Sequence, residues 1–426
     1  MERVESPETY IDLFLAHVAE ISEDATLSDR LIGFINTNNL EEDRLEKIGN
    51  VFSNLINVSG KRVYYLPSVY EQKNVAIPPE ERLHHACIYA DLATIKKIAA
   101  QSPELLDLLA GSPQLSKLMI AARYAPVAVV QFLLENGADA SITDSDGWDA
   151  LHHACQAGSL EAAELLAFEK SLNATTTDGA TPLMLAAGNG HFAVVQFLLK
   201  GGADTSIKNA NGVNALHSAC QGGSLEAVQL LILKIDPNTI GARGTPLMVS
   251  VYCEHLAIVE FLLEEGADPA LTDTNGWNVL HHACLSGSLE TAELLASHID
   301  LNVTMTGGQT SLMAAAQNGH QAIVQFLLGK GADASTKDSA GCNALHFACI
   351  GGSLETVQVL TSHIDLKATT TSSQTPLMLA AQNGHFTVIQ FLLEKGAETS
   401  ITDSNGWNAL HIACEAGSLE AAELLT

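Results

Sequence analysis

Residues 409–414 read Ala-Leu-His-Ile-Ala-Cys, and residues 344–349 read Ala-Leu-His-Phe-Ala-Cys. Further copies are centred on three other histidines and on one weaker match: His281, His217, His152, and Leu83 to Cys87. From the copy at His152 onward, successive copies are separated by 65, 64, 65 and 65 residues. A fixed period of this kind indicates a stack of repeated units rather than one large core.

A second repeated string lies midway between these copies. Thr181 to Ala187 reads Thr-Pro-Leu-Met-Leu-Ala-Ala, and its relatives follow the same steps. They are centred on four other methionines: Met119, Met248, Met313 and Met378. The repeating unit is therefore about 32–33 residues long and alternates between a His type and a Met type, a length typical of stacked supersecondary repeats.

Each unit reads as turn, helix, tight loop, helix. Thr181 can cap the first helix, and Pro182 is tolerated at its first position. Residues 188–191 break that helix, residues 192–199 carry apolar side chains at helical spacing, and Gly202 closes the second helix. In the His type an asparagine takes the capping position: Asn214, Asn278, Asn343 and Asn408.

These units resemble the ankyrin repeat. Residues 375–406 follow that family's pattern closely, from Thr375-Pro-Leu-Met through Gly384-His385 to Gly396-Ala. The resemblance covers residues 80–426, about eleven units, the first degenerate and the last truncated. It departs from the family where Met replaces the motif His, and where residues 251–255 lack the interhelical Gly. The resemblance implies an all-α solenoid with short β-hairpin fingers.

Residues 1–79 lie outside the repeat and resemble no family we recognise. Amphipathic patterns at residues 9–21 and 40–56 predict a small helical N-terminal region over residues 1–59, and residues 60–79 read as an extended connector. Sibling units continue past the position matching Thr426, so we expect a chain cut within its last unit. That unit should be the least protected from amide exchange, because terminal repeats need a polar outer face.

The composition excludes several functions. With 49 acidic and 21 basic residues the formal net charge is -28, which disfavours nucleic acid and anionic membranes as partners. No run of 18 apolar residues spans a bilayer, and the acidic start at Met1 is unlike a signal peptide. We therefore expect a monomer in the cytoplasm, with the nucleus as the alternative.

Six cysteines stand three residues after a motif His: Cys87, Cys155, Cys220, Cys284, Cys349 and Cys414. Equivalent pairs lie two units apart, about 20 Å at the usual layer spacing. This distance is too long for a shared zinc site or a disulfide. We predict that these cysteines are free core residues and that the chain binds no metal or cofactor. Its other candidate groups are copies of scaffold positions, whereas a catalytic residue should be singular, so we predict no enzyme.

Three tryptophans recur just before the helix cap: Trp148, Trp277 and Trp407. In the ankyrin family this position lies near the finger tip, beside the groove that commonly contacts partners. Tryptophan is enriched in binding hot spots, so these residues are candidate anchors. The alternative is a four-unit duplication that copied a Trp packed against a neighbouring finger.

The pair of residues before the interhelical Gly faces the groove in the ankyrin family, and here it supplies six further candidates: Gln156, Gln221, Gln317, Asn318, Gln382 and Asn383. The sequence thus predicts a noncatalytic scaffold or adaptor that binds a protein, with a basic segment favoured by charge. The alternative is the targeting or regulatory arm of a larger enzyme or channel whose functional domain lies beyond this chain.

Overall fold

The computed structural model describes residues 79–88, 91–108, 115–167 and 171–426. The chain divides into two compact units, Met1–Ser145 and Asp146–Thr426. The predicted helical region 1–59 and nearly all of the predicted connector 60–79 lie outside the described residues.

In the first compact unit two helix pairs follow one another. α5 packs against α6 and α7, and α7 packs against α8. A short 3-10 helix, η1, follows α6. The bounds are α5 (Pro79–Ile88), α6 (Leu92–Gln101), η1 (Pro103–Leu105), α7 (Lys117–Tyr124) and α8 (Val127–Glu135).

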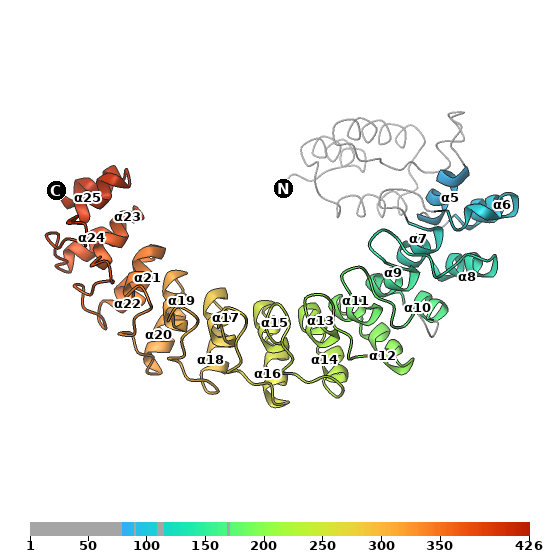
Figure 1. The fold of residues 1–426 in the computed structure, drawn as a ribbon, viewed down its shortest axis with the longest axis horizontal. Helices are drawn as coiled ribbons and strands as arrows, with labels where there is room; N and C mark the ends of the chain where they lie inside the picture. The colour runs from blue at the N-terminus through green and yellow to red at the C-terminus, as the bar shows by residue number, and fades with distance from the viewer. Residues whose placement is uncertain (1–78, 89–90, 109–114, 168–170) are drawn as a thin grey trace, which may run out of the picture. The chain divides into compact units, whose positions relative to one another are not determined.

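The second compact unit is a row of helix pairs, as Figure 1 shows. His and Met units alternate along this row. The first helix of each pair is called inner and the second outer. Inner helices of His units are α9 (Ala150–Ala157), α13 (Ala215–Gly222), α17 (Val279–Ser286), α21 (Ala344–Gly351) and α25 (Ala409–Glu415). Inner helices of Met units are α11 (Pro182–Gly188), α15 (Pro246–Tyr252), α19 (Ser311–Gln317) and α23 (Pro376–Gln382).

Each inner helix is followed by the outer helix that it packs against. The outer helices are α10 (Leu160–Leu166), α12 (Phe192–Lys200), α14 (Leu225–Leu231), α16 (Leu256–Glu264), α18 (Leu289–Leu295), α20 (Gln321–Gly329), α22 (Leu354–Leu360), α24 (Phe386–Glu394) and α26 (Leu419–Leu425). Inner helices pack on the next inner helix and outer helices on the next outer helix, so the core is a continuous apolar layer between the two rows.

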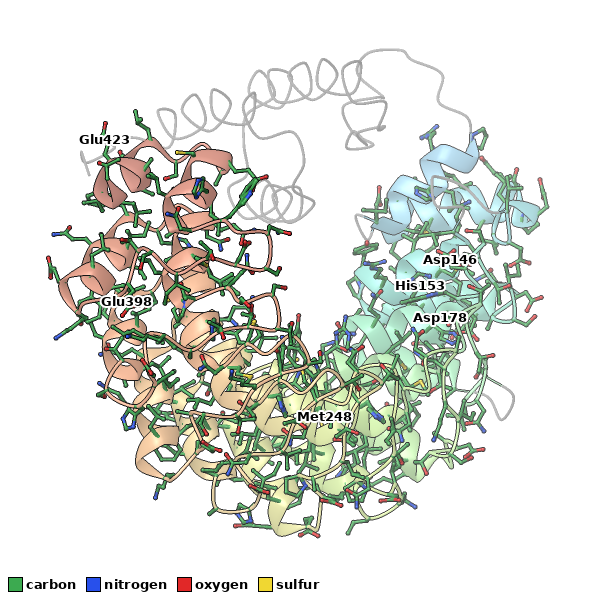
Figure 2. All side chains as sticks on the ribbon, turned by 60° about the vertical axis from the view of Figure 1, so that its left-hand side comes forward. Asp146, His153, Asp178, Met248, Glu398 and Glu423 are labelled. Atoms are coloured by element: carbon green, nitrogen blue, oxygen red, sulfur yellow. The ribbon has the colours of Figure 1, made fainter. Side chains whose placement is uncertain are left out.

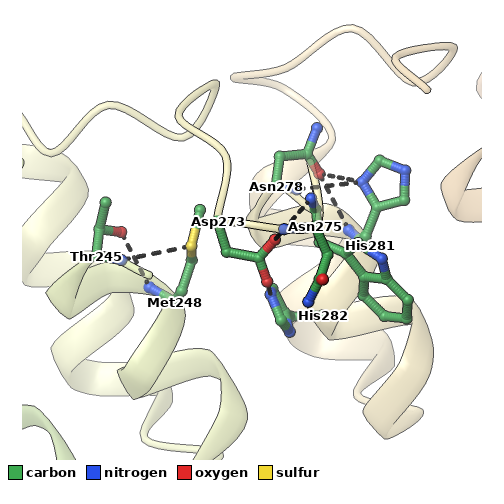
Figure 3. A network of polar contacts seen from close by, with 8 residues as sticks. Thr245, Met248, Asp273, Asn275, Asn278, His281 and His282 are labelled. Carbon is green, nitrogen blue, oxygen red and sulfur yellow. Dashed lines mark hydrogen bonds and ion pairs between the residues drawn. The ribbon is translucent and has the colours of Figure 1, made fainter. Parts of the chain in front are cut away.

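The predicted helix caps are confirmed. Thr245 Oγ1 accepts from the backbone N–H of Met248 at 3.3 Å, and Asn278 Oδ1 accepts from that of His281 at 3.1 Å (Figure 3). In both cases the cap satisfies an N–H group that the first turn leaves without a helical partner. Both types of unit therefore begin their inner helix by the same device, although the cap residue differs.

The segment before each inner helix is a finger, and the short β-hairpins expected there form turns without strands. Over residues 171–426 the fingers contain no strand and two isolated bridges, Gly241 with Gly244 and Thr304 with Thr310. A turn of about four residues leaves too little chain on either side for a ladder. Most neighbouring fingers are instead joined by a single backbone hydrogen bond, such as Thr177 N–H to Asp146 O at 2.8 Å.

Candidate protein-interaction surface

The candidate surface consists of the fingers and the pair of residues at the end of each inner helix, the C-cap included, where the sequence placed its site residues. Figure 2 shows the described side chains along the array, with Met248 labelled near the middle of the second compact unit. Two kinds of joint alternate beneath this surface. A His–Met joint connects a His unit to the Met unit after it, and a Met–His joint connects a Met unit to the following His unit.

A buried motif histidine reaches forward across two His–Met joints. His217 Nε2 lies 3.2 Å from the carbonyl oxygen of Gly244, and His281 Nε2 lies 3.3 Å from that of Gln309. Each Nδ1 stays within its own unit, beside the asparagine cap, at 2.6 Å for His281 and Asn278. The motif histidine therefore ties the start of its own helix to the finger of the next unit.

A second histidine reaches backward across every His–Met joint of the second compact unit. The ring of His320 approaches Gly287 so closely that a Cβ there would lie 2.6 Å from Cε1. Gly287 also has a φ of 86°, which a side chain would strain. The four contacts from Nε2 to a carbonyl oxygen are His191 to Gln156 (3.0 Å), His255 to Gln221 (3.3 Å), His320 to Leu285 (3.2 Å) and His385 to Ile350 (2.9 Å).

The loops after the outer helices add a third link to the same joints. Asn302 Oδ1 accepts from the backbone N–H of Asp333 at 2.8 Å. At the last His–Met joint an ion pair replaces this bond, with Lys367 Nζ 2.5 Å from Glu398 Oε1. The same asparagine link occurs at Asn173 with Asp204 and at Asn238 with Asp268.

Met–His joints lack these side-chain links. Over residues 172–426, where every residue is described, all side-chain hydrogen bonds and ion pairs between units cross His–Met joints. At the Met–His joint between α19 and α21 the backbones of the two inner helices approach each other closely instead. A Cβ on Gly351 would lie 1.9 Å from the carbonyl oxygen of Gln317. The two kinds of joint are therefore built differently.

Burial controls titration at the motif positions. It lowers the pKa of His217 and His281 to about 4, although hydrogen bonds to backbone carbonyls oppose the shift. Burial also lowers the pKa of His346 to about 4. These histidines are therefore neutral at physiological pH, and His217 and His281 act as structural bridges rather than proton carriers.

Five of the six motif cysteines are buried, as predicted, but Cys414 is exposed. The prediction that Cys414 is a core residue is wrong. Its equivalent Cys349 lies in α21, which packs against the next inner helix α23, whereas α25 has no further inner helix after it among the described residues. All eight cysteines are free. Burial raises the pKa of the Cys87 thiol to about 12, so such thiols stay protonated and inert. The described residues contain no group of three or more His, Cys, Asp or Glu side chains placed to hold a metal ion.

The three tryptophans differ in exposure. Trp148 and Trp277 are half-buried, whereas Trp407 is 37% exposed. The ring of Trp277 lies against two rings of its own unit, with centroids 6.2 Å from His281 and 5.5 Å from His282. Trp148 makes the corresponding contacts with His152 and His153. Both rings thus combine packing within their unit with surface left open.

The Trp277 contact includes a carboxylate. Asp273 Oδ1 accepts from the backbone N–H of Trp277 at 3.0 Å, and Asp273 Oδ2 lies 3.3 Å from His282 Nε2 (Figure 3). Burial lowers the pKa of His282, and Asp273 opposes that shift. The finger is therefore fixed on its helix by the carboxylate.

The predicted amide residues fall into two groups. Asn318 and Asn383 donate their side-chain amides to the carbonyl oxygens of Ala314 and Leu379, so they close their own helices. The side chains of the three exposed glutamines make no hydrogen bond within the described part of the chain: Gln221, Gln317 and Gln382. Gln156 is half-buried, and its Oε1 has no hydrogen-bond partner there.

The sequence-based site missed three residues near the middle of the array. Tyr252, the last residue of α15, is 63% exposed, and Leu285, near the end of α17, is 39% exposed. The guanidinium of Arg243 lies 5.9 Å from the Tyr252 ring centroid. The signal was available, because Tyr252 and Leu285 occupy the same position in their units as Gln221 and Gln317. Tyr252 was overlooked because its unit lacks the interhelical Gly that marks this position, and Leu285 was passed over because only amide side chains were taken as candidates there.

One other site, a surface depression, carries less chemistry. The outer helices α22 and α24 border a depression of about 460 Å³ whose lining mixes polar and apolar side chains: Gln358, Thr361, Ser362, Leu366, Phe391 and Lys395. Its lining holds one titratable side chain. No helix in the described part of the chain has the length and apolar character required to cross a membrane.

Comparison with known proteins gives a consistent result. A family model for ankyrin repeats in three copies matches residues 118–209, 201–273, 247–338, 330–403 and 345–426. The probable 26S proteasome regulatory subunit p28 of Saccharomyces cerevisiae is 30% identical over 204 residues, covering 46% of this chain and 89% of that protein.

Two larger proteins also match. E3 ubiquitin-protein ligase KEG of Arabidopsis thaliana is 29% identical over 301 residues, covering 65% of this chain. Human transient receptor potential cation channel subfamily A member 1 is 28% identical over 473 residues, covering 80% of this chain. The chain spans 18% of the ligase and 42% of the channel subunit.

Proposed function

Since the chain belongs to the ankyrin-repeat family, we propose that it is a noncatalytic scaffold or adaptor that binds a partner protein through the candidate surface. The observation that carries this proposal is the exposure of Tyr252 and Leu285 on neighbouring inner helices. Exposed apolar side chains rimmed by polar ones mark interaction sites. Gln221 and Gln317 on the flanking units supply that rim. Their side-chain amides make no hydrogen bond within the described part of the chain.

Trp277 is the central anchor of the proposed surface. It is a half-buried aromatic ring held in place by its contact with His282, so a partner would meet it already ordered. Ordering before binding lowers the entropy cost of association. Trp148 and Trp407 are proposed as further anchors for a partner long enough to reach them, since the three recur every four units.

The proposed partner carries a basic segment, because the chain has a net charge of -28. Asp146 and Asp178 are exposed finger residues that could meet such a segment. Arg243 is a basic residue on this acidic surface. We propose that it binds a carboxylate or carbonyl group of the partner beside Tyr252. A cytoplasmic location and a monomeric state stay predictions.

A peptide selection tests the proposal. A displayed library of random peptides is selected on the full chain, and the affinity of the best peptide is then measured by calorimetry for variants. We expect Trp277→Ala to weaken binding by about 2 kcal/mol, roughly 30-fold, the threshold for a hot spot. Tyr252→Ala should have a similar effect. Gln325→Ala, on the exposed face of outer helix α20, is the matched control and should leave affinity unchanged.

Thermal melting of the same variants separates binding from packing. A Trp277→Ala protein that melts earlier but binds with unchanged affinity would make Trp277 structural, as the duplication interpretation holds. Loss of affinity in Gln325→Ala equal to that in Trp277→Ala would place binding on the outer helices and contradict the proposed surface.

A second candidate function is the targeting or regulatory arm of a larger enzyme or channel. It is supported by the coverage of its relatives, since this chain matches only 18% of a ubiquitin ligase and 42% of a channel subunit. Sequencing the full-length transcript decides between the two. A coding region that continues into a catalytic or membrane-spanning domain favours the arm, and a stop shortly after residue 426 favours the adaptor.

A further inference from the structure

One Met–His joint differs from the other three in the second compact unit. It lies between α15/α16 and α17/α18, and we call it the central joint. Residues 241–302 are all described, and no hydrogen bond or ion pair crosses this joint. Each of the other three has one backbone bond between fingers: Ala210 N–H to Asp178 O (2.7 Å), Ser339 N–H to Gly307 O (2.8 Å) and Ser404 N–H to Ser372 O (2.9 Å).

A shorter finger explains the missing bond. The finger before α15 closes with the N–H of Gly241 on the carbonyl oxygen of Gly244, at 2.9 Å. The equivalent finger before α19 closes with the N–H of Met305 on that of Gln309, one residue further along. This single deletion is also the origin of the 64-residue steps in the repeat. The tip that carries the acceptor elsewhere, at Gly307, is therefore missing here.

The helices at the central joint also lack the close approach seen elsewhere. At two other Met–His joints a glycine ends the inner helix of the His unit, and a Cβ on Gly222 would lie 2.5 Å from the carbonyl oxygen of Ala187. Ser286 takes this position in α17 and carries the Cβ that such an approach excludes. Before the joint, Glu254 stands where the other Met units of the second compact unit have glycine, with a φ of 60°.

Apolar contact is what remains. α15 packs on α17 and α16 on α18, through buried residues such as Val251 and Cys284. Figure 3 shows both sides of the joint: dashed lines connect Thr245 with Met248, and Asp273 with its own unit, but none connects the two sides. Apolar burial is non-directional, so it resists separation far more than it resists sliding or tilting.

We propose that the central joint is a hinge, about which residues 146–272 and 273–426 change their relative angle. Neighbouring His–Met joints on both sides are cross-linked by histidines and asparagines, so the bending concentrates at the one joint without directional bonds. Hinge and shear motions use a few residues at the ends of elements, which here are the short finger and the turn at Glu254. The hinge divides the candidate surface between Tyr252 and Leu285, and a partner that contacts both would select one angle.

Distance distributions between two spin labels test the hinge in the full chain. Labels are introduced as unnatural amino acids, which leaves the eight cysteines unchanged. The pair at exposed positions Glu226 and Gln325 spans the central joint and one His–Met joint on each side. The pair at Glu290 and Gln390 spans the same set with an ordinary Met–His joint at its centre. We expect the first distribution to be about twofold wider, as for a hinge beside a rigid element.

The rescue variant has one glycine inserted between Arg243 and Gly244. The insertion lengthens the finger before α15 to the length of the finger before α19, which contains Gly307. We expect it to narrow the first distribution to the width of the second, with circular dichroism confirming that the array is folded. Equal widths in the unaltered protein would overturn the hinge. A wide distribution that the insertion leaves unchanged would overturn its assignment to the short finger.

Discussion

His–Met and Met–His joints pack the same kind of helices and yet are held together differently. The joint between α17 and α19 has a forward histidine, a backward histidine and an asparagine, whereas the joint between α19 and α21 has one backbone bond and a close approach at Gly351. Because a net hydrogen bond contributes about 0.5–1.5 kcal/mol, the His–Met joint gains more from directional bonds. The array is thus a series of two-unit modules rather than a row of equal repeats.

Acidification should show the largest difference between the joints. Folded His217 and His281 have a pKa of about 4, below the value of about 6.5 in an unfolded chain. The unfolded state therefore binds protons first as pH falls below about 6.5, and stability is lost until about pH 4. Between about pH 7.5 and pH 5 each buried histidine should cost about 1–2 kcal/mol. Urea unfolding at the two pH values measures it.

The matched variant is His281→Met, which installs the residue of the Met units. It should lower stability near neutral pH by about 1 kcal/mol, through the lost bond to Gln309, and reduce the acid loss by one histidine's share. If the variant shows the same acid loss as the unaltered protein, other groups titrate and the histidines are not responsible.

A methyl group at Gly351 should produce the next largest effect. Gly351→Ala places its Cβ against the backbone of Gln317, so we expect a loss of about 1–3 kcal/mol from overpacking. This outweighs the gain of about 1 kcal/mol that alanine brings to a helix over glycine. Denaturant unfolding measures the difference.

Ser286→Ala is its control at the central joint, and it should stay within about 0.5 kcal/mol. A Gly351→Ala protein as stable as this control would show that Met–His joints tolerate a wider spacing than the structure has.

Removing an outer link should have a smaller effect. Asn302→Ala deletes the acceptor for the N–H of Asp333, and because both residues are exposed, water can replace the bond. We expect a loss near about 0.5 kcal/mol, the lower end for a hydrogen bond. Asn405 is an exposed finger residue whose side chain makes no hydrogen bond within the described residues, so Asn405→Ala should leave stability unchanged. Equal losses in the two variants would exclude a specific contribution from the outer link.

Thiol reactivity provides the smallest and most local readout. Cys414 is exposed, whereas Cys284 and Cys349 are buried within the modules, and burial raises the pKa of both of these thiols. In the native protein we expect an aromatic disulfide reagent to modify Cys414 fast and these two only after denaturation. Rapid native modification of Cys349 would mean that its module opens readily.

Local features of the fold were predictable and the joints were not. The cap hydrogen bonds, from the N–H of Met184 to Thr181 and from that of His281 to Asn278, join residues three positions apart within one helical turn. The partner of His320 is a backbone carbonyl at Leu285, 35 positions away, and any residue type would supply it. No residue pattern therefore marked which joint it would cross. Similarly, the 64-residue step was visible in the sequence. Its consequence, the missing hydrogen bond at the central joint, depends on whether the shortened finger reaches the next finger.

The location of the candidate residues in the fold was predictable, whereas their role in binding stays a prediction. The Trp and Gln positions lie where the sequence placed them, in fingers and at helix ends. Exposure was not readable, because Tyr252 and Val251 are both apolar neighbours in one helix and differ only in which side of α15 they occupy. The role of Asn318 was also hidden, since an asparagine at a helix end either binds a partner or closes the helix.

The placement of both histidines on one kind of joint limits how this chain can be lengthened or shortened. Removing a single His unit would bring two Met units together, and their joint would have no forward histidine. Removing a single Met unit would bring two His units together, without the backward one. Only a cut of two units restores a joint with both. Variants of this array, whether made by recombination or by design, should therefore tolerate changes in steps of 65 residues and resist changes of half that length.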